Sequence, residues 1–156
     1  MLVHMTDETD DVLDAVGDAF SRLRRRTTQV AVDPPVSPKD LTRNLIINLI
    51  DEADGDLTVG DVAQQLAVSP SVGSRMVSDC IEAGIVRRVA SQQDGRKSML
   101  ELTDDGRALR NVFRRQYRHA FEQITHDWPD GERREFARLL LKYADATTSL
   151  RATPPR

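Results

Sequence analysis

The chain has 156 residues, of which 39% are hydrophobic and 30% are charged, and its formal net charge is -3. This composition is typical of a soluble globular protein and excludes a largely disordered or fibrous chain. No apolar run approaches the roughly 20 residues that a membrane helix needs. Cys80 is the only cysteine, so an intrachain disulfide is excluded and a thiolate zinc site is not expected.

Charge is unevenly distributed along the chain. Residues 1–18 contain six acidic residues and no lysine or arginine, whereas residues 69–98 contain five basic residues against three acidic ones. The acidic start lacks the basic segment and the apolar stretch of a signal peptide, so we expect a cytoplasmic protein. Because a local basic patch is what attracts nucleic acid, the negative total does not exclude DNA binding.

The first predicted helix runs from Asp11 to about Gln29. Its apolar residues recur every three or four positions, which places them on one helix face. Pro34 and Pro35 then end the helix, because proline lacks a backbone donor and restricts the residue before it. The apolar stripe consists of Val12, Leu13, Val16, Phe20 and Leu23.

A second helix is predicted to begin after Ser37, which acts as the N-cap. Pro38 lies in its first turn, and Asp40 follows three residues after the cap. We expect the helix to end near residues 54–56. Its predicted buried stripe consists of Leu41, Leu45, Ile46, Leu49 and Ile50.

Two short helices are predicted between Leu57 and Gly84. Thr58 and Asp61 form a capping box for the first helix, which extends through residue 67. Ser69 caps the second helix, which runs to about residue 83 and is followed by Gly84 as a left-handed residue. The inner face of this second helix is predicted to carry Val72, Met76 and Cys80.

A β-hairpin is predicted next, with strands at residues 85–90 and 98–102 and a polar turn around Asp94 and Gly95. Thr103 then caps a long helix that continues to about Trp128, and a last helix starts near Asp130. We therefore predict a mainly α fold, a winged helix-turn-helix with a small β-hairpin wing flanked by N- and C-terminal helices. A frayed tail is expected over residues 149–156.

The second short helix has the features of a helix that enters the DNA major groove. An α-helix fits that groove, and small polar residues at its start permit a close approach. Ser69, Ser71 and Ser74 supply such groups, and Arg75 can bind a guanine or a phosphate. The alternative is a helical hairpin used only for packing, which the basic hairpin tip disfavours.

Residues 57–106 resemble the DNA-binding core of the multiple-antibiotic-resistance regulator (MarR) family. The resemblance lies in four stretches: Leu57-Thr58…Val62-Ala63…Leu66, Ser69-Pro70-Ser71…Ser74-Arg75, Ala83-Gly84-Ile85-Val86-Arg87-Arg88 and Asp94-Gly95-Arg96…Leu100-Glu101-Leu102-Thr103…Gly106. In that family the terminal helices of two chains interlock into a dimer, and each winged module reads half of a pseudo-palindrome. Members commonly repress promoters, and they often release DNA when a small aromatic or phenolic effector binds.

The resemblance implies roles for the wing as well as for the recognition helix. Arg96 would enter the minor groove, Asp94 would orient its guanidinium group, and Arg88 would brace the wing or contact phosphate. The alternative for the tip is a plain turn with a solvated charge pair. The predicted DNA-binding set is Ser69, Ser71, Ser74, Arg75, Arg88, Asp94, Arg96 and Lys97.

The same resemblance implies a division of the chain. Residues 37–102 would form the winged helix-turn-helix domain, residues 7–30 and 103–148 a helical dimerisation region, and residues 149–156 the tail.

Two positions depart from the family pattern. Gly73 stands where a side chain is usual, and glycine inside a helix costs roughly 1 kcal/mol. It either allows a closer approach of the backbone to DNA or reflects sequence drift. Cys80 stands where leucine is usual, and we expect an inert buried thiol there, the alternative being a redox-responsive regulator.

The long helix offers weaker candidate sites. His119 and His126 share one face, but a third metal ligand is missing, so no metal site is expected. Its aromatic residues are expected in a dimer core, with an effector pocket as the alternative: Phe113, Tyr117, Phe121 and Trp128. Its arginines form a solvated face or pair with the acidic first helix: Arg107, Arg110, Arg114, Arg115 and Arg118.

Taken together, the sequence predicts a homodimeric, sequence-specific regulator of transcription that binds double-stranded DNA. A repressor with a small-molecule effector and no cofactor is the leading interpretation. A winged-helix module that binds protein is the alternative, although such a module would not require the basic tip. An enzyme is not expected, because a phosphate-binding glycine loop, zinc-type His/Glu spacing and a nucleophile elbow are all missing from the sequence.

Overall fold

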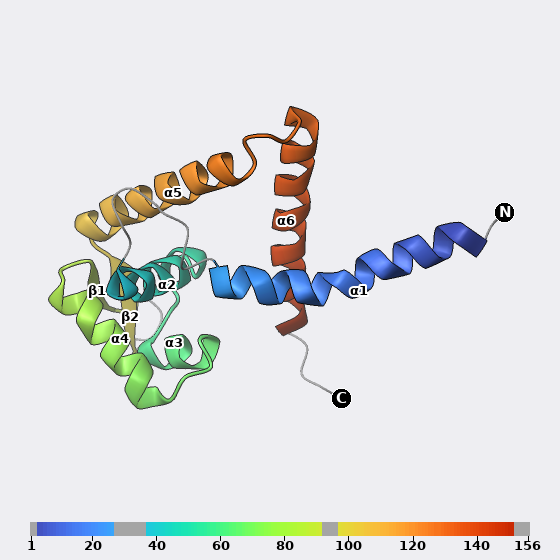
Figure 1. The fold of residues 1–156 in the computed structure, drawn as a ribbon. Helices are drawn as coiled ribbons and strands as arrows, with labels where there is room; N and C mark the ends of the chain where they lie inside the picture. The colour runs from blue at the N-terminus through green and yellow to red at the C-terminus, as the bar shows by residue number, and fades with distance from the viewer. Residues whose placement is uncertain (1–2, 27–36, 92–96, 152–156) are drawn as a thin grey trace, which may run out of the picture. The chain divides into compact units, whose positions relative to one another are not determined.

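The computed structural model describes residues 3–26, 37–91 and 97–151. The mainly α fold with one small hairpin is as predicted (Figure 1). Among the described residues, no helix is long and apolar enough to cross a membrane. The elements in chain order are α1 (Val3–Arg26), α2 (Pro38–Glu52), α3 (Val59–Gln65), α4 (Pro70–Glu82), β1 (Val86–Ala90), β2 (Ser98–Leu102), α5 (Asp104–Ile124) and α6 (Asp130–Arg151).

Helices α2 and α3 begin at the capping residues that the sequence predicts. The Oγ of Ser37 accepts a hydrogen bond from the backbone N of Asp40 at 3.1 Å, and the Asp40 carboxylate accepts one from the backbone N of Ser37 at 3.2 Å. Thr58 and Asp61 form the same reciprocal pair at 3.2 and 2.8 Å. These local bonds satisfy amides that a helix N-terminus otherwise leaves unpaired.

The helices α3 and α4 both end in a left-handed residue. Gly84 has a φ of 73°, as predicted, and the amides of Gly84 and Ile85 donate to the carbonyls of Ile81 and Cys80 at 2.9 and 3.1 Å. Helix α3 ends at residue 65, earlier than predicted, and there the left-handed position is held by Ala67, with a φ of 53°. A side chain in this conformation is strained, because its Cβ crowds the following carbonyl.

The buried core differs in detail from the predicted stripe of α2. Ile46 and Ile50 are buried as predicted, whereas Leu45 is 49% exposed and Ile47 is buried in its place. Asn44 is also buried, and its Nδ2 donates to the hydroxyl oxygen of Tyr117 on α5 at 3.1 Å. The buried stripe is therefore centred on residues 46, 47 and 50, and the buried Asn44 beside it makes a polar contact with α5.

The core of the winged module extends into α5. Phe113 is buried in the same cluster as residues from α2, α3, α4 and the hairpin, and Leu109 packs against it. The chain divides into two compact units, residues 1–117 and 118–156. The first part of α5 thus packs against the core of the winged module, and the predicted boundary of that module at residue 102 stays a prediction.

Thr103 connects the end of α4 to the start of α5. Its hydroxyl donates to the carbonyl of Gly84 at 2.6 Å and accepts from the backbone N of Gly106 at 3.0 Å, which confirms the predicted cap. A Cβ on Gly106 would lie 2.1 Å from the carbonyl oxygen of Ile85. The two segments therefore approach closely enough to require a residue without a side chain.

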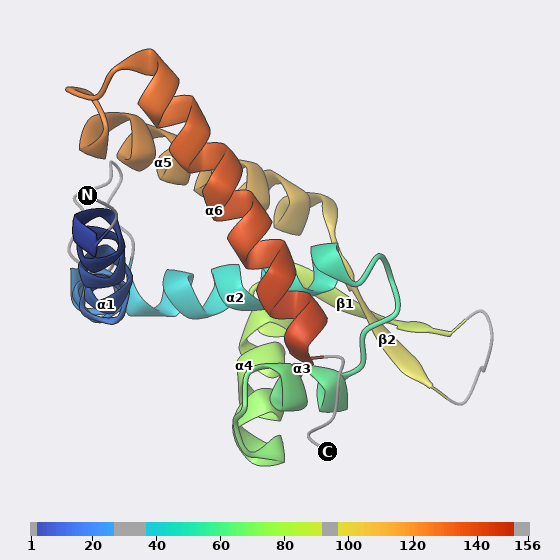
Figure 2. The same ribbon diagram turned by 90° about the vertical axis from the view of Figure 1, so that its right-hand side faces the viewer.

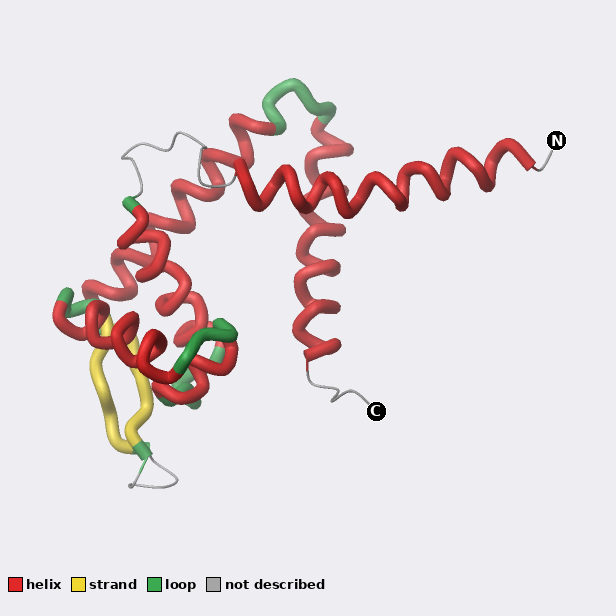
Figure 3. The backbone as a smooth tube through the Cα atoms, turned by 60° about the horizontal axis from the view of Figure 1, so that its bottom comes forward, coloured by secondary structure: helices red, strands yellow, loops and turns green. Residues whose placement is uncertain are grey.

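Strands β1 and β2 form the predicted antiparallel hairpin (Figure 2), with Val86 opposite Leu102 and Ala90 opposite Ser98. The backbone N of Leu100 also donates to the carbonyl of Leu57 at 2.8 Å, which anchors β2 to the segment before α3. Figure 3 shows the two strands in yellow; the predicted turn residues 92–96 lie outside the described residues.

Helices α1 and α6 both extend further than predicted. Helix α1 begins at Val3 rather than near Asp11, and its predicted end at Gln29 lies outside the described residues. Helix α6 continues to Arg151, past the predicted start of the tail. The predicted stripe of α1 is exposed in the single chain: Val12, Leu13, Val16, Phe20 and Leu23.

Candidate nucleic-acid interface

The two helices of the helix-turn-helix, α3 and α4, are in close contact. Gly73 on α4 is buried, and a Cβ built on it would lie 2.7 Å from the Cβ and 3.0 Å from the Cα of Ala63 on α3. From the sequence we expected Gly73 either to let the helix backbone approach DNA more closely or to reflect sequence drift. Instead, Gly73 faces α3, and its missing side chain lets the two helices approach each other.

The start of α4 presents the predicted small polar residues. Ser69 and Ser71 are exposed with their hydroxyl oxygens 3.1 Å apart, and the Oγ of Ser69 also accepts from the backbone N of Val72 at 3.4 Å as the N-cap. Ser74 is half-buried and Arg75 is exposed. The structure therefore brings these four predicted residues together on the first two turns of one helix.

The inner face of α4 differs from the prediction at one of its three predicted residues. Cys80 is fully buried and Met76 packs against the core, as predicted, but Val72 is 40% exposed. Gly73 and Val77 are buried instead. Val72 therefore lies at the surface beside the serines and offers an apolar contact there.

Only part of the predicted wing site lies within the described residues. Arg88 on β1 is exposed, and so is Lys97, whose carbonyl accepts a hydrogen bond from the backbone N of Ser91 at 2.9 Å. Asp94 and Arg96 lie outside the described residues, so their predicted pairing stays a prediction.

Two ion-pair features near the site were missed by the sequence interpretation. Arg87 pairs with Glu101 across the hairpin at 2.9 Å, which engages a cation adjacent to Arg88. On α4, the carboxylate of Asp79 pairs with Lys39 and Arg43 of α2 at 2.8 and 3.2 Å. The hydrogen bond from Lys39, with a further contribution from Arg43, lowers the pKa of Asp79. These contacts join residues far apart in sequence, so no local motif signals them.

The environment of Cys80 does not fit a redox sensor. Its thiol is fully buried, and burial, together with the nearby charge of Asp79, raises its pKa to about 11. Because the thiolate is the reactive form, a buried thiol with a raised pKa is inert. The structure thus favours the packing role over the redox-responsive alternative.

The predicted aromatic set does not form one cluster. Phe113 lies in the core of the winged module, whereas aromatic residues of the unit 118–156 contact one another. Three of them do so: Phe121 stacks on Phe136 with ring centroids 6.2 Å apart, and Trp128 meets Phe136 edge-on at 5.4 Å.

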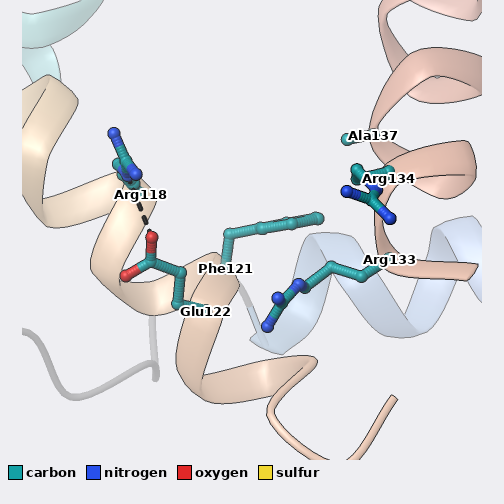
Figure 4. A pocket seen from close by; sticks show the side chains of 6 residues that line it. All are labelled: Arg118, Phe121, Glu122, Arg133, Arg134 and Ala137. Carbon is teal, nitrogen blue, oxygen red and sulfur yellow. Dashed lines mark hydrogen bonds and ion pairs between the residues drawn. The ribbon is translucent and has the colours of Figure 1, made fainter. Parts of the chain in front are cut away.

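A hollow of about 560 Å³ lies beside Phe121 (Figure 4). Arg118 of α5 and Arg133 and Arg134 of α6 line it together with Phe121, Glu122 and Ala137. Arg118 pairs with Glu122 at 2.9 Å, and this bond lowers the pKa of Glu122. The hollow is open and its lining is mostly charged.

The remaining candidates on α5 and just after it are not arranged as a ligand site. His119 and His126 are exposed, and no group of three potential metal ligands occurs in the described part of the chain. Of the predicted arginine face, Arg107 pairs with Asp104 and Arg110 pairs with Asp51, while Arg114 and Arg115 are exposed.

Comparisons with known proteins agree with this geometry. Residues 40–97 match a model of the MarR family, whereas no curated protein sequence matches significantly. One of the similar solved structures is described as a MarR family transcription regulator.

Solved structures of regulators share the fold over most of the chain. The PcaV transcriptional regulator from Streptomyces coelicolor, in complex with its natural ligand, has a TM-score of 0.57 and 22% identity, covering 84% of this chain and 92% of that one. Streptococcus pneumoniae FabT, in complex with DNA, has a TM-score of 0.53 and 20% identity, covering 93% and 99%. A MarR family protein from Bacillus stearothermophilus has a TM-score of 0.61 and 21% identity, covering 95% and 99%. Residues 40–97 thus resemble the MarR family, and the chain shares the fold of these solved structures over most of its length.

Proposed function

We propose that this protein is a homodimeric, sequence-specific regulator that binds double-stranded DNA at a pseudo-palindromic operator. It acts as a repressor and releases the operator when a small aromatic or phenolic effector binds. Helix α4 is the recognition helix, and the β1–β2 hairpin is the wing.

The main support is the surface at the start of α4. One side of this helix is buried through Gly73, Val77 and Cys80, so its rotation about its own axis is fixed. The other side presents Ser71 and Arg75 to solvent. A helix held in this way presents hydroxyl and guanidinium groups to base edges and phosphates in the major groove.

Homodimerisation is supported by apolar side chains that the single chain leaves uncovered. Large apolar side chains that gather on a surface mark interaction sites in soluble proteins. Two copies related by a two-fold axis would bury these surfaces and place two recognition helices about one DNA turn, roughly 34–36 Å, apart. The exposed residues outside the winged module include Val12, Leu13, Val16, Ile124, Leu139, Leu140 and Leu141.

Two of the similar structures are complexes, and they support the remaining parts of the proposal. FabT is in complex with DNA, and PcaV is in complex with its natural ligand. A ligand that binds only a dimer with mismatched spacing of the recognition helices would shift the population away from the DNA-bound form.

The proposal is tested by fluorescence anisotropy on the duplex upstream of the protein's own gene. A scrambled duplex of equal length and a salt series serve as controls, because sequence-independent binding depends strongly on salt. We expect a clear preference for the native duplex. If that duplex shows none, selection from a random duplex library identifies the operator.

Failure of the library selection to enrich any sequence would contradict the DNA-binding function. It would favour the alternative, a winged-helix module that binds a protein. Sedimentation of the free protein tests the dimer separately, with a monomer at micromolar concentration as the contradicting result.

A further inference from the structure

The carboxylate of Asp79 on the recognition helix is shared by two cations of α2. Its Oδ1 lies 2.8 Å from the Nζ of Lys39, and its Oδ2 lies 3.2 Å from the Nε of Arg43. Lys39 and Arg43 are one helical turn apart on α2. A single carboxylate that contacts both positions therefore restricts how α4 can slide and rotate against α2.

This contact lies at the edge of a buried interface. The side chains of Arg43 and Asp79 keep 22% and 30% of their accessible surface, whereas Lys39 keeps 62%, and Cys80 beside Asp79 is fully buried. Fully exposed ion pairs hold their partners loosely, because the two long side chains lose entropy when they are fixed. A partly buried pair with two hydrogen-bonded cations is better suited to hold an orientation.

The same contact affects Arg75. Arg75 lies four residues before Asp79 on α4, a spacing at which an arginine and an aspartate on one helix can pair. Asp79 is instead bound to the cations of α2, and Arg75 forms no ion pair with any described residue. The guanidinium group of Arg75 is thus left for another partner.

We propose that Asp79 is a positioning residue for DNA recognition. Through Lys39 and Arg43 it holds α4 in the orientation that specific binding requires and leaves Arg75 available, without contacting DNA itself. This inference rests on the DNA-binding function proposed above.

The test compares the affinities of four proteins for the operator and for a scrambled duplex by fluorescence anisotropy, across a salt series. The proteins are the wild type, Asp79→Asn, Asp79→Glu and Glu82→Gln. Glu82 is exposed on the same helix, so Glu82→Gln matches the charge change of Asp79→Asn without breaking the pairs to α2. Circular dichroism confirms that each variant is folded at the assay temperature.

We expect Asp79→Asn to lower the ratio of operator to scrambled affinity about tenfold, the scale of a typical coupling between a distant side chain and a binding site. The salt dependence should stay unchanged, because no phosphate contact is lost. Asp79→Glu keeps the charge and should retain most of the preference. Glu82→Gln should change both affinities together and leave the ratio unaltered.

A second comparison separates positioning from direct contact. The double variant Lys39→Gln/Arg43→Gln should lose the preference for the operator to the same degree as Asp79→Asn. Combining all three changes should cause little further loss, because the three residues act as one unit. If the double variant instead lowers the salt slope by about two, Lys39 and Arg43 contact phosphates directly and the inference is wrong.

Two further results would overturn the inference while leaving the proposed function intact. One is an unchanged ratio in Asp79→Asn, and the other is an equal loss in Glu82→Gln. A wild-type protein that prefers no duplex would overturn the proposed function, and this inference with it.

Discussion

Gly73 and Ala63 stand at the point where the two helices of the helix-turn-helix touch. A Cβ on Gly73 would lie 2.7 Å from the Cβ of Ala63 and 3.0 Å from its Cα. Real Cβ atoms do not approach side chains that closely, and the Cα of Ala63 cannot move without moving α3. The angle between α3 and the recognition helix therefore depends on the absence of a side chain at residue 73.

We expect Gly73→Ala to destabilise the protein. Overpacking in a core costs about 1–3 kcal/mol, which outweighs the roughly 1 kcal/mol that alanine gains over glycine in a helix. Urea unfolding followed by circular dichroism measures the change. Gly60→Ala is the matched control, because its Cβ would meet only the Oγ1 of Thr58 at an ordinary 3.6 Å. Equal stability of Gly73→Ala and wild type would contradict the close packing.

We expect Ala67→Gly to stabilise the protein. Ala67 has a φ of 53° at the end of α3, and the left-handed conformation costs an L-residue roughly 1–2 kcal/mol. Glycine relieves this strain but adds flexibility to the unfolded chain, so a net gain of about 0.5–1 kcal/mol is expected. The midpoint of urea unfolding measures it. Gly84→Ala, at the equivalent position of α4, should show the opposite sign, and a shift of both variants in the same direction would contradict this account.

The thiol of Cys80 should react slowly with thiol reagents in the folded protein. It should also lower the free energy of unfolding at high pH. Its folded pKa is about 11 against an ordinary value of 9.0. Between these values the unfolded chain loses the thiol proton and the folded chain keeps it, so ionisation favours unfolding as pH rises from 9 to 11. Below pH 9 the thiol is protonated in both the folded and the unfolded chain, so it causes no pH dependence of the free energy of unfolding.

The check on Cys80 has two parts. Ellman's reagent should label the native protein only at the rate of unfolding, and urea should accelerate the labelling. The stability of wild type relative to Cys80→Ala should decline above pH 9. Rapid labelling of the native protein at pH 8 would restore the redox-responsive alternative.

Arg75 and Lys97 should affect DNA binding differently. Arg75 lies on the recognition helix, where an arginine that reads a guanine contributes about 1–3 kcal/mol to discrimination. Lys97 lies at the base of the wing tip, where a phosphate contact would contribute equally to every sequence. We therefore expect Arg75→Ala to lower the preference for the operator. Lys97→Ala should instead weaken binding to all duplexes and reduce the salt slope by about one.

The exposed Arg114 on α5 provides the control for this comparison. Arg114→Ala should alter neither preference nor salt slope. A loss of preference in Lys97→Ala together with an unchanged preference in Arg75→Ala would reverse the two assignments.

Features set by short-range chemistry were predictable from the sequence. The N-caps at Ser37, Thr58 and Ser69 depend on side chains bonding amides two or three residues away, and the structure confirms all three. The left-handed Gly84 and the hairpin strands were predicted from local sequence in the same way, and the structure confirms both.

Features set by contacts between distant segments were not predictable. The spacing of apolar residues predicts Val72 on the buried face of α4. Gly73 is buried there instead, and because glycine has no apolar side chain, the apolar pattern does not indicate its burial. The left-handed conformation of Ala67 was also not predictable, because such a position is usually recognised by a glycine and here it is an alanine. The pairing of Asp79 with Lys39 and Arg43 spans segments that only the fold brings together.

The central claim is a symmetric dimer that reads two half-sites, and hydroxyl-radical footprinting on the operator tests it most directly. We expect two protected regions related by two-fold symmetry, with centres about one DNA turn, roughly 34–36 Å, apart. A single unsymmetrical protected region, or uniform weak protection along the duplex, would contradict it.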